Sequence, residues 1–285
     1  MLTALTELSV RGYRFQHFHG LTALNRLKHL TVQQLAVLDL TGSLGATALV
    51  SLTLSQLTLT DSYARMLDIL RSMSLLTKIS LSKLEAADVD MLGLKALLEL
   101  PKLENLCITR CDDLDYSLEA DSCKISQNLT RLHLDIPGLV LHPEMSALRQ
   151  LSFLVKLHLE LDMEDTIYAV PSSLSTLSYL KELGLGPSHP WDMAQAIDIT
   201  PLAKLGPAME DVYLLGSTEL FATGSLVALA EQPNLCHIWL TVAGNCCISS
   251  DGPSWLHCAA LLHALLTRLS RGLSAVSVQP DLTSF

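Results

Sequence analysis

A six-residue aliphatic pattern, Leu-x-x-Leu-x-Leu with Ile, Val or Met in some positions, recurs eleven times along the 285-residue chain. The copies begin at Leu5, Leu27, Leu49, Leu76, Leu103, Leu129, Leu154, Leu180, Met209, Leu235 and Leu273, in steps of 22 to 29 residues with a last step of 38. The last two aliphatic residues of each copy lie two positions apart, so a strand would turn both to one side. Because so short a strand cannot bury that side alone, the copies are expected to stack as a solenoid with a parallel sheet. A further match at Leu35 is too close to the copy at Leu27 to form its own coil, so the register between residues 24 and 54 stays open.

The segments between the strands are expected to return the chain across the back of the sheet, mostly as helices. Residues 63–73 carry an apolar stripe at helical spacing, and Pro143 and Pro171 each precede a stretch with similar spacing. Residues 254–269 place apolar side chains on one helical face. We therefore expect this C-terminal helix and the last repeat, over 251–285, to cap the solenoid.

The repeat resembles that of leucine-rich repeat proteins over roughly residues 2–280. The resemblance implies an α/β fold, a right-handed horseshoe with a parallel sheet on its concave face and about eleven repeats of 22–29 residues, in one domain spanning 1–285. The stretch 103–111, Leu-Glu-Asn-Leu-Cys-Ile-Thr-Arg-Cys, also resembles the cysteine-containing branch found in F-box and ribonuclease-inhibitor proteins. Where that family expects Asn or Cys, most repeats here carry other residues, for example Leu57 and Leu84.

Composition and charge limit the ligands and the cellular compartment that we expect for such a domain. A net charge of −10 argues against a general nucleic-acid surface, since affinity for phosphates depends on Lys and Arg. No apolar run approaches the length of a membrane span, and no secretory signal is visible. Seven cysteines without framework spacing favour a reducing, intracellular compartment, the cytoplasm or the nucleus. The first repeat leaves no room for a cap, so its edge either abuts further sequence of a larger protein or is tolerated because the strand is short.

The residue between the second and third aliphatic positions should point to the opposite, solvent-facing side of the sheet. Along the chain this row reads Ser9, Thr31, Thr53, Ser80, Cys107, His133, His158, Gly184, Tyr213, Trp239 and Ser277. Tyr213 and Trp239 should stand side by side, flanked by Asp211, Leu215 and His237, as a hot spot for a protein partner. The alternative is that the loop at 244–253 or the C-terminal helix covers them.

Two neighbouring repeats carry the same polar triplet on this face. The triplets are Arg131, His133 and Asp135, then Lys156, His158 and Glu160. They predict a charged recognition patch, while a divalent metal site or a simply solvated face remain alternatives. Cys107 lies one repeat before His133, but an open sheet offers no cleft or oxyanion site, so we expect no catalytic residue.

The sequence therefore predicts a non-enzymatic protein-interaction module that binds a protein partner through the concave face, with no cofactor, no nucleic acid and no membrane. The family resemblance implies roles such as the recognition part of an F-box ubiquitin ligase adaptor or of an immune receptor. Two alternatives stay open. One is a regulator similar to GTPase-activating leucine-rich repeat proteins, with Arg110 against a nucleotide, and the other is a metal-binding protein using His133 and His158.

Overall fold

The structure is a computed structural model of residues 1–285 in which two compact units, Met1–Pro137 and Gly138–Phe285, are distinguished. It describes residues 4–12, 24–38, 48–59, 63–86, 92–111, 114–115, 125–135, 149–161, 172–187, 202, 204–215, 229, 232, 234–243 and 275–281.

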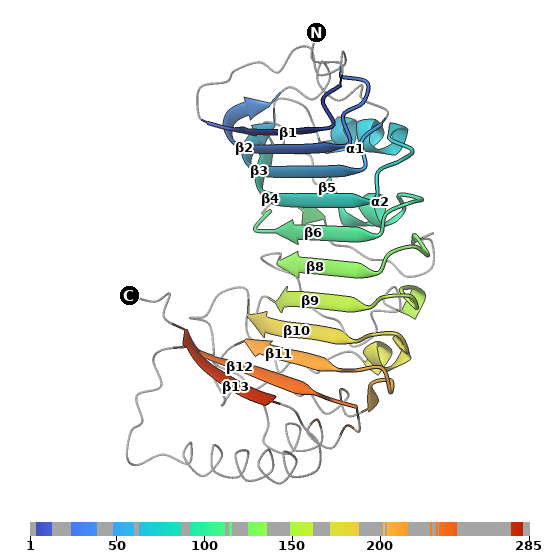
Figure 1. The fold of residues 1–285 in the computed structure, drawn as a ribbon, viewed down its shortest axis with the longest axis vertical. Helices are drawn as coiled ribbons and strands as arrows, with labels where there is room; N and C mark the ends of the chain where they lie inside the picture. Colours follow the sequence, from blue (N-terminus) through green and yellow to red (C-terminus); the bar gives the residue numbers. More distant parts are fainter. Residues whose placement is uncertain are drawn as a thin grey trace. The chain divides into compact units, whose positions relative to one another are not determined.

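The first unit contains a parallel sheet in which neighbouring strands come from successive repeats. Its strands are β1 (Glu7–Arg11), β2 (His29–Leu38), β3 (Ser51–Leu59), β4 (Lys78–Ala86), β6 (Asn105–Thr109) and β8 (Arg131–Asp135), paired in that order. Their arrows lie side by side and point the same way in Figure 1. A small second sheet pairs β5 (Leu92–Gly93) with β7 (Leu114–Asp115).

The second unit repeats the same arrangement. Its strands are β9 (Lys156–Leu161), β10 (Glu182–Pro187), β11 (Asp211–Leu215), β12 (His237–Ala243) and β13 (Ala275–Asp281), again parallel and paired in chain order (Figure 1). Each copy of the aliphatic pattern coincides with one strand of the two units. The predicted parallel sheet is therefore confirmed.

The register within each unit places equivalent aliphatic residues opposite one another. Leu52 pairs with Ile79 and Leu54 with Leu81 between β3 and β4, and all four side chains are at most 1% exposed. The residues between them point to the other side and are partly exposed, as Thr53 is. This alternation forms a column of leucines inside each unit, in which full burial of one side chain contributes roughly 1.5–3 kcal/mol.

Successive coils are also tied by their backbones where each strand begins. The carbonyl of Val50 accepts hydrogen bonds from the amides of Thr77 and Lys78, at 2.9 and 3.1 Å. In the second unit the carbonyl of Val155 is bonded in the same way by the amides of Lys181 and Glu182. The repeat thus satisfies backbone groups that would otherwise be left at the strand edge.

A left-handed residue follows the aliphatic pattern in four copies of the first unit, and β2, β3 and β4 continue past it. Gln34, Gln56, Lys83 and Arg110 have φ of 57°, 56°, 50° and 53°, and each lies two residues beyond the last aliphatic residue of its copy. The next residue turns back into the core, so Leu57, Leu84 and Cys111 are at most 2% exposed. Leucine therefore replaces the expected Asn or Cys because continued pairing, Leu35 to Leu57 to Leu84, satisfies the backbone there. This also resolves the open register, since Leu35 belongs to the extension of β2 rather than to another coil.

The connecting segments confirm one predicted helix and correct another. Helix α1 (Tyr63–Ser72) buries the predicted stripe, and the Tyr63 hydroxyl donates a 3.2 Å hydrogen bond to the carbonyl of Leu84. A short helix, α2 (Leu94–Leu98), was not singled out from the sequence. The stretch after Pro171 is a 3-10 helix, η3 (Ser172–Thr176), and not an α-helix. The helices expected after Pro143 and over 254–269 lie outside the described residues.

None of the helices in the described part of the chain is long and apolar enough to cross a membrane.

Candidate functional site

Most of the predicted binding residues of the second unit lie in two rows on the face opposite its leucine column. Across β9, β10, β11 and β12, the charged row consists of Lys156, Glu182, Asp211 and His237, and the aromatic row of His158, Gly184, Tyr213 and Trp239. The side chains in both rows are partly exposed, except at Gly184, which is buried. Glu160, the third member of its predicted triplet, lies farther along β9 and is also partly exposed.

Tyr213 and Trp239 stack on one another, as their positions in the aromatic row predict. Their ring centroids are 5.8 Å apart and their planes differ by only 6°. His237 lies on the same strand as Trp239, with ring centroids 6.5 Å apart and planes tilted by 36°. A stacked aromatic pair contributes about 0.5–1.5 kcal/mol beyond its buried area, so the two rings stabilise each other's orientation.

A glycine allows a third ring to join this stack. The imidazole of His158 lies over Gly184, where a Cβ atom would come within 2.8 Å of the ring atoms Cγ and Nδ1. The ring of His158 thereby reaches to 5.7 Å from that of Tyr213, with a tilt of 39° between the planes. The aromatic row thus contains three rings on four strands. The strand between His158 and Tyr213 carries Gly184, and the His158 ring occupies the space that a side chain would take there.

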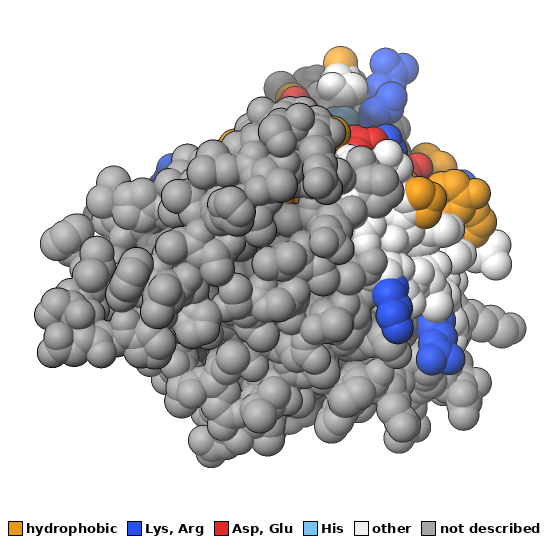
Figure 2. All heavy atoms as spheres, turned by 90° about the horizontal axis from the view of Figure 1, so that it is seen from below, with side chains coloured by type: hydrophobic (Ala, Val, Ile, Leu, Met, Phe, Trp, Pro, Cys, Tyr) orange, Lys and Arg blue, Asp and Glu red, His pale blue; other side chains and the backbone are white. Residues whose placement is uncertain are grey.

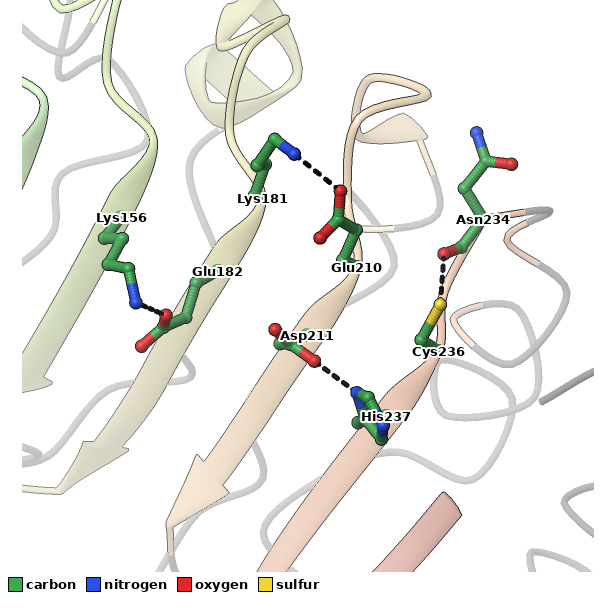
Figure 3. A network of polar contacts seen from close by, with 8 residues as sticks. All are labelled: Lys156, Lys181, Glu182, Glu210, Asp211, Asn234, Cys236 and His237. Atoms are coloured by element: carbon green, nitrogen blue, oxygen red, sulfur yellow. Dashed lines mark hydrogen bonds and ion pairs between the residues drawn. The ribbon is translucent and has the colours of Figure 1, made fainter. Parts of the chain in front are cut away.

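Glu182 binds the two residues of β9 that precede it in the rows, and it was not predicted from the sequence. Lys156 Nζ donates to Glu182 Oε2 (Figure 3). On the same carboxyl group, Oε1 lies 2.9 Å from His158 Nε2. Burial of the carboxyl group favours its neutral form. The hydrogen bonds and charges of Lys156 and His158 outweigh burial, so the pKa of Glu182 lies below its ordinary value. Glu182 therefore holds the His158 ring in place as a carboxylate.

The rest of the charged row contains a carboxylate–imidazole pair. His237 Nδ1 lies 2.6 Å from Asp211 Oδ1, and these side chains are 39% and 28% exposed. One residue before Asp211, Glu210 points the other way and accepts a 2.7 Å hydrogen bond from Lys181 Nζ (Figure 3). Burial, followed by the negative charges of Glu182 and Asp211, raises the pKa of the Tyr213 phenol, while Lys156 opposes this shift. The electrostatic potential at the Tyr213 hydroxyl is therefore negative on balance.

A sequence signal for Glu182 did exist. It occupies the position immediately before the second aliphatic residue of its repeat, directly after Lys156 and before Asp211 in the row. Had the charged row been considered together with the aromatic row, it would have predicted an acidic residue, Glu182, directly opposite a basic one, Lys156, on the neighbouring strand. The role of Gly184 was harder to find, because it depends on which rotamer His158 adopts.

The triplet of the first unit behaves differently from the one in the second. Arg131 is exposed and His133 partly exposed, but Asp135 is only 5% exposed and pairs with Arg110 Nε at 3.7 Å. Asp135 is therefore buried, where an exposed side chain was expected. Arg110, its ion-pair partner, has a left-handed backbone, and its amide donates a 2.7 Å hydrogen bond to the Asp135 carbonyl.

The two triplets belong to different units, and each is described within its own unit. Among the side chains that the structure describes, no group of three or more His, Cys, Asp and Glu residues could hold a metal ion. Cys107 pairs in register with His133, as the repeat predicts. The side chain of Leu215, the loop at 244–253 and the C-terminal helix lie outside the described residues, so covering of Trp239 by these segments stays an open alternative.

A second aromatic pair, missed in the sequence, lies on the turns before β9 and β10. Phe153 and Tyr179 are 47% and 57% exposed and stack with ring centroids 6.1 Å apart. Figure 2 shows that hydrophobic side chains at the surface lie beside acidic and basic ones. At the equivalent place before β12, Asn234 Nδ2 donates to the carbonyl of Pro207 in the preceding coil. Residues at this position therefore join neighbouring coils, and the Phe153–Tyr179 stack does so through its rings.

The similarity of this structure to solved structures is at the level of the fold. No family model matches the chain, and no curated protein matches it in sequence. An internalin (InlF) from Listeria monocytogenes matches with a TM-score of 0.56 at 15% identity, covering 100% of this chain and 88% of that one. A leucine-rich repeat protein from Leptospira interrogans matches with a TM-score of 0.53 at 16% identity, covering 92% of this chain and 66% of that one. The chain thus has a leucine-rich repeat fold, and nothing in these matches supports the cysteine-containing branch.

Proposed function

We propose that this chain is a protein-interaction module whose partner binds the face of the second unit that carries the charged and aromatic rows. The observation that carries the proposal is the partly exposed, parallel stack of Tyr213 and Trp239. Tyrosine and tryptophan are enriched among the few residues that supply most of the binding energy of protein interfaces. A strand face holding two such rings side by side is suited to that role.

The surroundings of the stack support the proposal through preorganisation. His158 contacts Tyr213 from one side, and Glu182 holds the His158 imidazole. Trp239 contacts Tyr213 and His237, and Asp211 binds His237. Rings that are already held in position lose little conformational entropy when a partner binds, so more of the contact energy is available for affinity.

Several finer expectations form part of this proposal. They are a single repeat domain over residues 1–285 with 251–285 as its cap, a horseshoe of about eleven repeats whose concave side carries the binding face, and an intracellular location. Also among them are the absence of enzymatic activity and a place within a larger protein, for which the F-box adaptor and the immune receptor are the examples implied by the sequence. No specific observation in the described residues favours the GTPase-activating alternative or the metal-binding alternative. Arg110, which the former needs on a nucleotide, pairs with Asp135.

The proposal is tested by affinity capture with the double variant Tyr213→Ala/Trp239→Ala. The wild-type protein and the variant are immobilised, exposed to a soluble extract of the cells that produce the protein, and the captured proteins are quantified by mass spectrometry. We expect at least one protein captured by the wild type to fall at least about tenfold with the variant, as for a hot-spot loss above 1.4 kcal/mol.

The matched control is Phe153→Ala/Tyr179→Ala, which removes the other stacked pair of the same unit. The control should retain the captured partner, because these rings lie on the turns and not in the aromatic row. Circular dichroism must show that both variants are folded. Equal capture by the wild type and the Tyr213/Trp239 variant would refute the proposed binding face.

A further inference from the structure

We infer that the partner presents a positively charged side chain, an arginine in preference to a lysine, to the corner of the face formed by Asp211, Tyr213 and Trp239. This inference rests on the proposed function and specifies the chemistry of the partner. It follows from the charge balance of the two rows and from the geometry of the rings.

Within the charged row, Asp211 and Glu182 are the two carboxylates, and they differ in the side chains that bind them. Glu182 is bound by the ammonium group of Lys156, and Glu210 by that of Lys181. Asp211 differs, because its ion-pair partner among the described residues is the imidazole of His237 and not an ammonium group. With 28% of its side chain exposed, Asp211 is accessible to an incoming cation.

The electrostatics of Tyr213 agree with this assignment. After burial, the charges of Glu182 and Asp211 raise the pKa of its phenol, and the opposing influence of Lys156 is smaller. Ionisation of the phenol would add a negative charge, so the same potential that disfavours ionisation favours a cation beside the ring. An acidic partner segment would meet repulsion at this corner.

The rings supply the remaining part of the site. Cations are attracted to the faces of tryptophan and tyrosine rings, and arginine, being planar and weakly hydrated, stacks on such rings better than lysine does. A guanidinium group next to the Tyr213–Trp239 stack can also donate a charge-assisted hydrogen bond to Asp211. The two rings lie parallel, within 6° of each other, on the two strands that also carry Asp211 and His237.

The experiment uses four blocked tripeptides, acetyl-Gly-X-Gly-amide, in which X is Arg, Lys, citrulline or Glu. Citrulline keeps the shape of arginine without its charge. Each peptide is titrated into the full-length chain labelled with ¹⁵N at its three tryptophans, and the indole signal of Trp239 is identified by its absence in Trp239→Phe. We expect a saturable shift of this signal with the arginine peptide, a weaker response with lysine, and none with citrulline or Glu over the same concentration range.

A pair of charge variants then tests the role of Asp211. Asp211→Asn should weaken binding of the arginine peptide about tenfold, the loss expected for one charge-assisted hydrogen bond. Glu210→Gln is the matched control, because it removes one negative charge from the adjacent residue while Glu210 faces Lys181. It should leave the affinity within about twofold, since a solvent-exposed charge is largely screened.

The remaining outcomes contradict the inference. Equal shifts with arginine and citrulline would mean that the corner does not select charge, and equal losses in the two charge variants would mean that only the overall field matters. No shift of Trp239 with any peptide would overturn the cation site itself. The proposed function would survive that result if the captured partner is still lost with Tyr213→Ala/Trp239→Ala and retained with Asp211→Asn.

Discussion

In the first unit, the positions between the strand leucines carry Thr31, Thr53 and Ser80, whereas in the second unit the equivalent positions carry His158, Tyr213 and Trp239. The aliphatic residues on either side of them pair in the same register in both units, and those whose side chains are described are at most 2% exposed. The repeat thus dictates the backbone and the core, and it leaves the alternate positions free to vary. A small hydroxyl group offers a partner little contact area, so we place the binding surface on the second unit.

The strands differ as well. In the first unit β2, β3 and β4 have 10, 9 and 9 residues, whereas β1, β6 and β8 have 5 each. In the second unit β9, β10 and β11 have 6, 6 and 5 residues, and β12 and β13 have 7 each. The three long strands of the first unit continue past a left-handed residue into an additional layer of buried leucines, whereas the second unit carries large aromatic side chains on its exposed face.

The largest effect should come from a charge in either leucine column. Leu132→Asp in the first unit and Leu183→Asp in the second each bury an unpaired carboxylate at a side chain that is 3% and 0% exposed. We expect each to lower the free energy of unfolding by more than about 4 kcal/mol, measured by urea denaturation followed by circular dichroism. Arg131→Asp, one position away on the exposed side, is the control and should cost less than about 0.5 kcal/mol. A small loss in only one of the leucine variants would show that the two cores are not equivalent.

Gly184→Ala should affect the second unit in a way that has no counterpart in the first. The added Cβ would lie 2.8 Å from the His158 ring, so the imidazole must leave Glu182 and Tyr213 or strain the strand. We expect a loss of about 1–3 kcal/mol, measured by urea denaturation, together with a changed chemical shift of the His158 ring protons. The control, Ser80→Ala at the equivalent place on β4, should change stability by less than about 0.5 kcal/mol. Were the two variants equally stable, the gap filled by His158 would have no energetic importance.

The sequence was sufficient to predict the strands, their pairing and the buried leucines because one spacing repeats and each copy supports the others. It also placed Tyr213 beside Trp239, since register alone determines neighbours in a row. Contacts that depend on side-chain rotamers or on local backbone conformation could not be predicted from the sequence. The His158 ring over Gly184 depends on a rotamer, and the ion pair of the buried Asp135 joins it to Arg110, a residue on a neighbouring strand end whose left-handed backbone the repeat pattern does not reveal. Glu182 was predictable in principle from the charged row.

The left-handed positions of the first unit permit a smaller, stabilising change. Gln56 has a φ of 56° and is exposed, so Gln56→Gly relieves backbone strain without removing a core contact. We expect a gain of roughly 0.5–1 kcal/mol in the free energy of unfolding by urea titration, net of the flexibility that glycine adds to the unfolded chain. Ser55→Gly, at the preceding strand residue, should instead destabilise by a similar amount. If both substitutions destabilise, strain at the left-handed residue is negligible.

The smallest effect concerns the titration of one phenol. The pKa of Tyr213 is raised above its ordinary value of 10.0, so the stability that this group contributes is fully present below that pH and is lost as the pH rises through the raised value. Subtracting the phenolate absorbance of Tyr213→Phe from that of the wild type isolates its titration curve. Glu182→Gln removes one of the negative charges, so the midpoint should move down toward 10.0 in that variant. An unchanged midpoint would contradict the negative potential assigned to this face.

The contrast between the two faces is tested most directly by site-specific photocrosslinking. A benzophenone side chain is placed at position 213 in one protein and at position 53 in another, because these positions are equivalent in the repeat of the two units. After irradiation in the extract used for affinity capture, crosslinked partner is quantified against total protein. We predict a crosslinked partner from position 213 and background yield from position 53. A yield from position 53 equal to or greater than that from position 213 would contradict the placement of the binding surface on the second unit.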